Sequence, residues 1–450
     1  MRQRMMTLAA VTLLALGSPA ATQLLGGGLP AGALPGGIGG AIGSLPGGVV
    51  GGGSGMTSGL PAIGGQGGVV NGLEGPLTGF GSTVDSLSPS NLLSLRRERL
   101  RTLVRQNRQI LDVDDAGNPV RRDVVIGIGL SPAAIEKAKA AGFTIRRSDT
   151  IEGLDLVTTT LAPPKGKPAR KAIDMLQAGD PQGSYTLDHV YEPARAPLLP
   201  MKGEAAAGGG NGGGPRIGLI DGGVGSHPAF ANASVQQRGF AGDARPSGHG
   251  TAVASLIVGN AGAFRGAAPS ASLMVADVYG GSPANGSAEA IVRAMGWLAQ
   301  GGAKVVNISL VGPPNSLLAA GVRALQRRGV IVVAAVGNDG PAAPPQYPAS
   351  YPAVVAVTGV DARGKALIEA GKPLHLDFAA PGADMVGAVP GGKWEKLRGT
   401  SFAAPFVTAR IALRGGVASL GSEAKVGSGR LGRGIVCGEC ETPPKAVGLK

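Results

Sequence analysis

Ser401 is the residue around which the reactive side chains of this sequence can be arranged. It lies in Gly399-Thr400-Ser401-Phe402-Ala403-Ala404-Pro405, and an apolar run with helical spacing continues to about Leu413. The serine is therefore expected near the first turn of a helix, where free backbone N–H groups and the helix dipole face any negative charge that forms beside it. Because a serine hydroxyl is a weak nucleophile until a base removes its proton, covalent catalysis by Ser401 needs a base, an orienting acid and a second oxyanion donor.

The base is expected to be His249. It lies in Ser247-Gly248-His249-Gly250-Thr251-Ala252-Val253-Ala254, where glycines on both sides allow a close approach of backbone and substrate. Of the other histidines, His227 lies in a turn and is interpreted as structural, His189 belongs to an N-terminal domain, and His375 has no motif around it.

An acid and an amide follow two predicted strands. Asp221 comes directly after Arg216-Ile217-Gly218-Leu219-Ile220, and Asn338 ends the run Ala334-Ala335-Val336-Gly337-Asn338. The carboxyl ends of parallel strands form the crevice in which such sheets bind ligands, and a side-chain amide there can donate to a developing oxyanion. Taken alone, Asp221 could equally be a turn residue, and Asn338 could cap a turn before Gly340.

The elements around these residues alternate between strands and helices. Short β-branched runs predict strands at 217–220, 273–277, 305–309, 330–335 and 354–357. Helical spacing predicts helices at 249–258, 288–299 and 317–328. Nearly continuous apolar strands with helical crossovers indicate an α/β fold whose parallel sheet has helices on both faces.

The first 90 residues are not expected to form a core. Arg2 and Arg4, an apolar run from Met5 to Leu16, and the small residues Ser18-Pro19-Ala20 have the pattern of an export signal. The following segment is dominated by Gly, Pro, Leu, Ala and Ser without a period, and we expect it to be disordered.

A small α+β domain precedes the parallel sheet. After a basic amphipathic helix at 91–111, expected to pack on a neighbouring domain, the strands 124–128, 143–147, 154–160 and 185–190 and the helices 132–141 and 169–178 follow in the order β-α-β-β-α-β. Ser131 is the expected N-cap of the first of these two helices. This order is that of a ferredoxin-like sandwich.

The chain therefore divides into six predicted segments. They are a signal peptide (1–20), a Gly/Pro-rich arm (21–90), the helix with the ferredoxin-like domain (91–195), a flexible Gly-rich linker (196–214), the parallel-sheet domain (215–436) and a tail (437–450).

Composition narrows the function. The net charge of +13 would suit nucleic acid, but aromatics make up only 3% and the basic residues form no cluster beyond short pairs, so nucleic acid is not the expected partner. No run after the signal reaches the length of a membrane span. The two cysteines, Cys437 and Cys440, are too few for a zinc site by themselves, and a local disulfide is expected.

Together, these motifs resemble the subtilisin-like serine peptidases, the subtilase family (peptidase family S8). Asp221-Gly222-Gly223, His249-Gly250-Thr251, Gly337-Asn338 and Gly399-Thr400-Ser401 match in the family's order, and the resemblance covers about 215–436. It implies that Ser401 attacks a peptide carbonyl, that His249 transfers the proton, that Asp221 orients the imidazole, and that Asn338 helps to form the oxyanion hole.

The resemblance has further implications. It implies an exported endopeptidase, secreted or periplasmic, whose partners are protein or peptide substrates and its own propeptide. The propeptide would be the ferredoxin-like domain, acting as an intramolecular inhibitor and cut between about Pro193 and Pro215. Substrate is expected to contact Ser309, Leu310, Val311, Gly312 and Gly337. No cofactor is expected to be required and no metal ligands are assigned, although structural calcium stays open because the family's calcium ligands are scattered.

Two features depart from the family pattern. The acid motif is Asp-Gly-Gly, which lacks the hydroxyl of the more common Asp-Thr-Gly or Asp-Ser-Gly. Val311 stands where well-known members carry glycine, which predicts a narrower cleft and a preference for small or medium uncharged residues before the cut. The alternative functions are a binding protein on an inactive peptidase scaffold and an esterase of the same mechanism.

Overall fold

The computed structural model describes residues 88–194, 206, 208–210, 212–427 and 429–450. The predicted export signal, nearly all of the Gly/Pro-rich arm and part of the predicted linker lie outside the described residues. Among the described residues, no helix is both long enough and apolar enough to cross a membrane.

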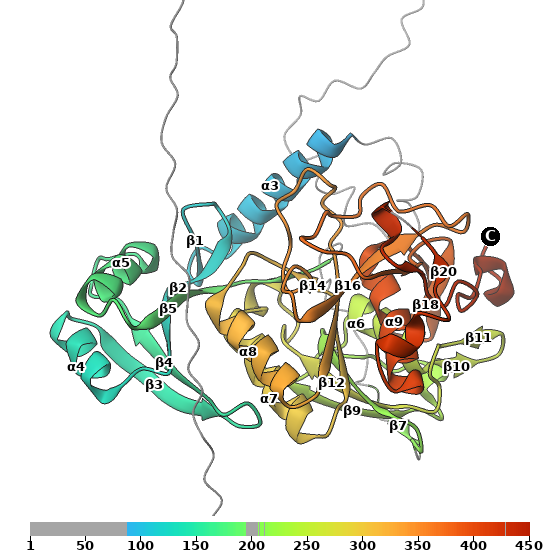
Figure 1. The fold of residues 1–450 in the computed structure, drawn as a ribbon, viewed down its shortest axis with the longest axis horizontal. Coiled ribbons are helices and arrows are strands. Elements are labelled where there is room, and N and C mark those ends of the chain that lie inside the picture. Colours follow the sequence, from blue (N-terminus) through green and yellow to red (C-terminus); the bar gives the residue numbers. More distant parts are fainter. Residues whose placement is uncertain (1–87, 195–205, 207, 211, 428) are drawn as a thin grey trace, which may run out of the picture. The chain divides into compact units, whose positions relative to one another are not determined.

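The N-terminal domain has the predicted β-α-β-β-α-β order. Its elements are β2 (Pro119–Ile128), α4 (Pro132–Ala140), β3 (Thr144–Ile151), β4 (Leu156–Ala162), α5 (Ala169–Gly179) and β5 (Ser184–His189). The strands pair in the order β5-β2-β4-β3, which is the ferredoxin-like arrangement. Ser131 caps α4 as predicted, since its hydroxyl accepts a hydrogen bond from the Ala134 N–H. Figure 1 shows α4 and α5 together beside this sheet.

The preceding basic helix, α3 (Pro89–Gln106), ends earlier than predicted. The side chain of Asn107 donates to the Leu103 carbonyl, and the chain then turns. Leu111, predicted as the last helical residue, begins β1 (Leu111–Val113), which pairs with the start of β2. Leu111 is fully buried with Leu103 and Val190. Leu111 is therefore in a strand because of this packing, although the helical spacing of the preceding residues predicted a helix there.

The large domain contains the predicted parallel sheet. Seven of the described strands form its parallel centre, in the spatial order β17-β16-β15-β13-β8-β12-β9. They are β8 (Arg216–Asp221), β9 (Ser234–Gly239), β12 (Ser272–Asp277), β13 (Val305–Ile308), β15 (Ile331–Ala335), β16 (Val354–Val360) and β17 (Phe378–Pro381). Five of the seven match the predicted strands; β9 and β17 were not predicted.

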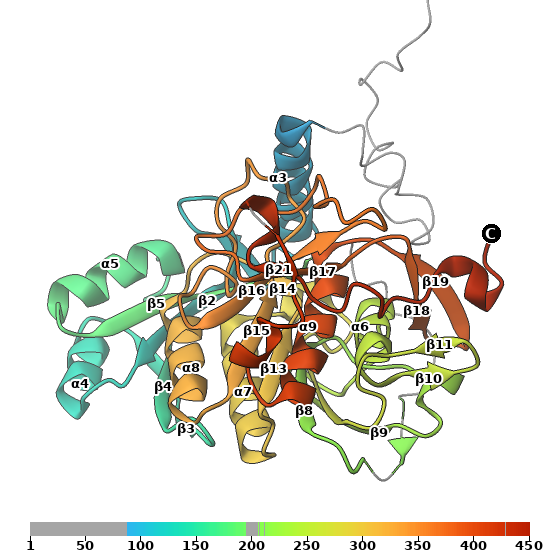
Figure 2. The same ribbon diagram turned by 45° about the vertical axis from the view of Figure 1, so that its right-hand side comes forward.

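Helices cover both faces of this sheet. One face packs on α6 (Gly248–Val258) and α9 (Thr400–Arg414), and the other on α7 (Ala288–Gln300) and α8 (Ser316–Arg327). Figure 2 shows the two helix pairs on either side of the strands. Successive residues of one strand enter different cores, as Val332 and Ala334 do on one side and Val333 and Ala335 on the other. This two-sided burial explains why the strands are continuously apolar.

Short elements extend the sheet at its edges. β7 (Gly208–Gly209) pairs with β9, so this part of the predicted linker is held in the fold rather than free. At the other edge lie β20 (Lys425–Val426) and β21 (Gly434–Ile435). Two hairpins, β10–β11 (Asn260–Ala261, Phe264–Arg265) and β18–β19 (Met385–Val389, Lys393–Leu397), stand apart from it.

The predicted tail is part of the folded domain. A disulfide joins Cys437 to Cys440, as expected. Thr442 is buried, and its carbonyl accepts a hydrogen bond from the Val386 N–H. Leu449, the last residue but one, packs on the same core as α6 and α9. The resemblance to the family ended before this segment, but the packing continues through it.

Candidate active site

Asp221 and His249 form a buried pair at the carboxyl edge of the sheet. Asp221 is the last residue of β8 and is fully buried, and His249 lies in the first turn of α6, which Ser247 caps. The His249 Nδ1 atom lies 2.9 Å from each carboxylate oxygen of Asp221. The Gly222 N–H also donates to this carboxylate, over 2.7 Å. The carboxylate therefore holds the Nδ1 proton, which leaves His249 Nε2 as the nitrogen that can accept another.

This pairing depends on a close approach between α6 and the loop after β8. A Cβ atom at Gly250 would lie 2.1 Å from the carbonyl oxygen of Gly222. Real Cβ atoms do not approach backbone oxygens so closely, so position 250 requires glycine for steric reasons. The glycine after the histidine therefore sets the distance between the strand that carries Asp221 and the helix that carries His249.

Ser401 is the second residue of α9 and is fully buried. Its Oγ atom and His249 Nε2 are both buried without a hydrogen-bond partner among the described residues. The serine lies at the start of the helix, as predicted, after Gly399, whose φ of +142° lies in the region that favours glycine.

A chain of buried polar side chains supports the backbone of Ser401. The Ser309 hydroxyl donates to the Ser401 carbonyl over 2.9 Å, and it accepts from the Asn307 amide over 2.9 Å. The Thr408 hydroxyl, two turns along α9, donates to Asn307 over 3.0 Å. These bonds tie α9 to the end of β13 and fix the position of the serine.

Asn338 has a fixed orientation. Its Oδ1 accepts a hydrogen bond of 2.9 Å from the Thr400 N–H, so its Nδ2 points away from α9 into the cleft. There Nδ2 donates to the main-chain carbonyl oxygen of Ala194. The preceding Gly337 has a φ of +92°, which a residue with a side chain rarely adopts.

The residues before Ala194 lie along the cleft as an added strand. β6 (Glu192–Pro193) pairs antiparallel with β14 (Leu310–Val311), and the Ala194 N–H donates to the Ser309 carbonyl over 2.9 Å. Adding a strand to an exposed edge is a common way of binding an extended peptide. The segment 192–194 therefore occupies the cleft in an extended, substrate-like conformation.

The pocket around Ala194 is narrow. Ala194 is buried in the same cluster as Val311. A Cβ atom at Gly337 would lie 3.2 Å from the Gln346 side chain and 3.4 Å from that of Val311. Val311 and Gln346 therefore both lie close to Gly337, and Val311 shares its buried cluster with Ala194.

Tyr191 fills a second, deeper site. It is fully buried, and its hydroxyl donates to the Pro313 carbonyl over 2.7 Å. Its N–H donates to the Gly286 carbonyl. A Cβ atom at Gly312 would lie 2.5 Å from the tyrosine ring, so the glycine makes room for it.

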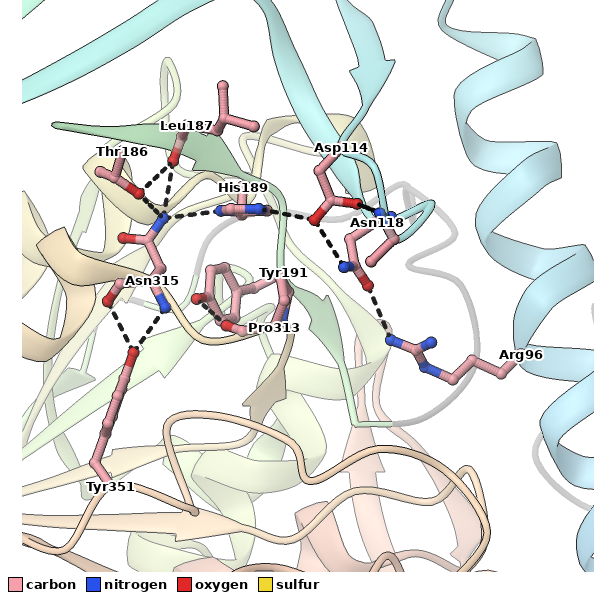
Figure 3. Close-up of polar contacts among 11 residues, drawn as sticks. Arg96, Asp114, Asn118, Thr186, Leu187, His189, Tyr191, Pro313, Asn315 and Tyr351 are labelled. Atoms are coloured by element: carbon pink, nitrogen blue, oxygen red, sulfur yellow. Dashed lines mark hydrogen bonds and ion pairs between the residues drawn. The ribbon is translucent and has the colours of Figure 1, made fainter. Parts of the chain in front are cut away.

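Asn315 joins the N-terminal domain to the large domain, as Figure 3 shows. Its Oδ1 caps α8 by accepting from Leu317 N and Leu318 N, so its Nδ2 faces the small domain. Nδ2 donates to the Leu187 carbonyl over 2.8 Å and lies 3.0 Å from His189 Nδ1. With that nitrogen as acceptor, the His189 proton lies on Nε2, 3.2 Å from Asp114.

The structure brings together every residue predicted for the site. Asp221, His249, Ser401 and Asn338 converge at one edge of the sheet. The predicted substrate-binding residues Ser309, Leu310, Val311 and Gly312 contact the segment 191–194, and Gly337 lies beside Val311. His227 and His375 contact other groups: His227 packs against Trp394, and His375 Nε2 bonds the Val354 carbonyl. Among the described residues, no group of three or more His, Cys, Asp or Glu side chains could hold a metal ion.

Several residues of the site were not predicted from the sequence. Thr408 and Gln346 contact the site only through the tertiary fold. Asp277, at the end of β12, is a second buried acid in the crevice; burial raises its pKa, while hydrogen bonds from the N–H groups of Arg245, Tyr279 and Gly280 oppose that rise. Its position at the carboxyl end of a predicted strand was the one available signal.

Comparison with known proteins places this site in a class. The model of the subtilase family matches residues 212–418. Subtilisin Savinase of Lederbergia lenta is 35% identical over 212 residues, which are 45% of this chain and 76% of that protein. The major intracellular serine protease of Bacillus subtilis (strain 168) is 32% identical over 203 residues, 42% of this chain and 64% of that protein.

A solved structure supports the fold over a longer span. Fervidolysin from Fervidobacterium pennivorans, a keratinolytic enzyme related to subtilisin, superposes with a TM-score of 0.60 at 19% identity, over 73% of this chain and 62% of that one. A fold with a buried Asp–His pair and a serine at a helix start defines a serine hydrolase. The chain belongs to the subtilase family and is a subtilisin-like serine peptidase.

Proposed function

We propose that this chain is an exported serine endopeptidase, made as a zymogen that cuts its own chain between Ala194 and Arg195. The observation that carries the proposal is the hydrogen bond from Asn338 Nδ2 to the Ala194 carbonyl oxygen. This carbonyl lies where an oxyanion donor would receive the carbonyl of a bond about to be cut, and the strand that leads to it is paired with the cleft.

The proposed mechanism assigns one role to each residue. Ser401 Oγ attacks the carbonyl carbon while His249 Nε2 takes the hydroxyl proton, and the resulting imidazolium is stabilised by Asp221. Asn338 Nδ2 and the Ser401 N–H donate to the oxyanion. His249 then protonates the leaving amine, and water hydrolyses the acyl-enzyme by the same steps in reverse.

The N-terminal domain acts in this proposal as an intramolecular inhibitor. After the cut, the new carboxyl end at Ala194 still occupies the cleft, and Asn315, Tyr191 and β6 hold the domain in place. Inhibition ends only when this domain dissociates or is degraded. Protein and peptide substrates then enter the cleft in the place of residues 191–194.

Export is supported by the sequence at the start of the chain and by the disulfide. A basic, then apolar, then small-residue pattern covers 1–20, and the Cys437–Cys440 disulfide suits an oxidising compartment. We propose a secreted or periplasmic location. Fusing residues 1–20 to a reporter that is active only outside the cytoplasm tests this location.

The central test compares the wild type with Ser401→Ala, both produced without residues 1–20. Intact mass is followed over time in both proteins. The wild type should be cleaved into a fragment that ends at Ala194 and a remainder, whether or not the two dissociate, while the variant stays whole. If both stay whole although folded, a fluorophosphonate probe on protein opened by an external protease distinguishes an enzyme that needs an activator from an inactive scaffold.

A further inference from the structure

Asp339, the residue after the oxyanion asparagine, is an acid that binds cations at the edge of the cleft. Its side chain is 8% exposed and forms ion pairs with Arg96, over 3.2 Å, and with Arg99, over 3.0 Å. Both arginines belong to α3, whose Leu92 packs on the neighbouring Gly340. The proposed mechanism gives Asp339 no role, and the predicted site did not include it.

The same arginine also binds the substrate-like strand. Arg99 Nη2 lies 3.3 Å from Glu192 Oε2 and 3.0 Å from Asp339 Oδ1. Arg99 Nη2 therefore bridges the carboxylates of Glu192 and Asp339. Glu192 is the third residue counted back from the proposed cut, so Asp339 faces the side chain at this position. Without a cation between them, two carboxylates so close together would repel each other.

The cut changes which groups Asp339 meets. Arg96, Arg99 and Glu192 all precede Ala194, so all three leave with the N-terminal fragment. Both arginines that pair with Asp339 in the structure are therefore lost from it once the fragment dissociates. In the mature enzyme, the acid therefore faces the substrate without Arg96 and Arg99.

We propose that Asp339 is a specificity-determining residue that favours lysine or arginine at the third position before the bond that is cut. This inference rests on the proposed function, because it counts positions from the cut after Ala194. A basic side chain at this position can bind Asp339 directly, as Arg99 does in the precursor. Glu192 can bind beside Asp339 in the precursor because Arg99 lies between the two acids. A substrate brings no such arginine, so an acidic residue at its third position should bind poorly.

The test uses the mature enzyme and internally quenched peptides that contain Tyr-X-Pro-Ala before the cut, with Lys, Gln or Glu as X. We expect kcat/KM to fall in the order Lys, Gln, Glu, with about a tenfold ratio between Lys and Glu, as for an ion pair replaced by like-charge repulsion near a protein surface. In Asp339→Asn, this ratio should approach one. Glu439→Gln removes an exposed acid of the tail and should keep the wild-type ratio.

The outcomes separate the two proposals. If the wild type cleaves the Lys and Glu peptides equally well, or if Asp339→Asn keeps the ratio, the inference about Asp339 is wrong while the peptidase function stands. If the wild type cleaves none of the peptides, the proposed function itself fails. A second measurement covers the case in which Asp339→Asn does not mature: the wild-type ratio should fall as salt is raised from 50 mM to about 500 mM, because screening weakens exposed charge pairs.

Discussion

The side-chain amide of Asn338 donates a hydrogen bond to the main-chain carbonyl of Ala194, 144 residues earlier in the chain. The Thr400 N–H fixes the other end of the same amide, so the donor cannot rotate away from the cleft without losing a partner. One side chain thus links the start of the helix that carries Ser401 to the last described residue of the N-terminal domain. The contact makes self-cleavage accessible to direct mutational tests.

Replacing Asn338 with leucine should slow both self-cleavage and peptide hydrolysis. Leucine has a similar size but cannot donate to the oxyanion, and the expected loss in kcat is about 10²–10³-fold, the range known for the equivalent donor of subtilisins themselves. The measurement is the rate of appearance of the fragment that ends at Ala194. The Thr400 N–H also loses its acceptor, so circular dichroism must first show that the variant is folded. A variant that is folded and processes at the wild-type rate would contradict the proposed oxyanion hole.

Residue size at position 194 should control maturation. Ala194→Phe places a ring in the buried cluster that Ala194 shares with Val311, and overpacking of this kind costs about 1–3 kcal/mol, so processing should slow by about 10–100-fold. Ala194→Ser, which adds only one atom, serves as the matched control and should mature normally.

A second substitution checks the cause. Val311→Gly removes one wall of the pocket, so it should restore processing of the Ala194→Phe chain while leaving β14 able to pair through its backbone. Mass spectrometry of the double variant measures how quickly the fragment that ends at residue 194 appears, and a rate near that of the wild type would confirm the role of Val311. If Ala194→Phe is processed as quickly as the wild type, Val311 does not limit the pocket.

Binding of the N-terminal domain should weaken as the pH rises from about 4 to 6. Burial raises the pKa of Asp188 to about 6, although Ser287 and Arg121 favour its charged form. In the dissociated domain the carboxyl ionises near its ordinary value of about 4. Below both pKa values Asp188 is protonated in the bound and in the dissociated domain, so its ionisation does not change the binding free energy. Between them, the dissociated domain ionises while the bound one keeps its proton, so each pH unit costs the complex up to about 1.4 kcal/mol, and the loss levels off above pH 6.

The measurement is the dissociation constant of the cleaved N-terminal fragment that ends at Ala194 from the mature enzyme at pH 4.5, 5.5 and 6.5. Asp188→Asn keeps an oxygen that can accept the hydrogen bond from the Glu289 N–H but cannot ionise. Because other titrating groups contribute equally in both proteins, the difference between wild type and variant at each pH gives the contribution of Asp188 to binding. Identical slopes in the two proteins would rule out Asp188 as the source.

Removing Arg99 should weaken inhibition after the cut. Arg99→Ala removes the cation that lies between the acids Glu192 and Asp339, and it leaves Arg96 as the one arginine of α3 paired with Asp339 in the structure. The inhibition constant of the fragment should rise about tenfold or more, since unpaired like charges are costly at a partly buried contact. Arg97→Ala, an exposed neighbour on the same helix, is the matched control. Equal inhibition by the two variants would show that Arg99 has no part in holding the fragment on the cleft.

Much of the core fold could be predicted because its signals are local. The run before Asp221, the capped start of α6 and the apolar helix after Ser401 each carry their own spacing, and the structure confirms each element within one or two residues. The order of the motifs, together with the strands before Asp221 and Asn338, then predicted that the catalytic residues meet at one edge of a parallel sheet. Local spacing failed at Leu111, where burial beside Val190 forms a strand instead of a helical turn.

The remaining contacts could not be predicted because they join distant segments. Arg99 and Asp339 lie 240 residues apart, and nothing in the sequence around either residue indicates the other. The tail was predicted to lie beyond the domain, since Cys437 and Cys440 matched no family motif, yet Thr442 pairs with the hairpin strand β18. Such contacts depend on the finished topology, which only the three-dimensional structure supplies.

The pairing of β6 with β14 places an evolutionary constraint on this protein. If the chain matures by cutting itself, residues 191–194 are the first substrate that every copy must accept. A mutation that retunes the pocket near Val311 then alters both what the mature enzyme digests and whether that enzyme is ever released from its precursor. New specificity is therefore accessible mainly through paired changes, one in the cleft and one in the strand 191–194, and engineering of the cleft should redesign the two together.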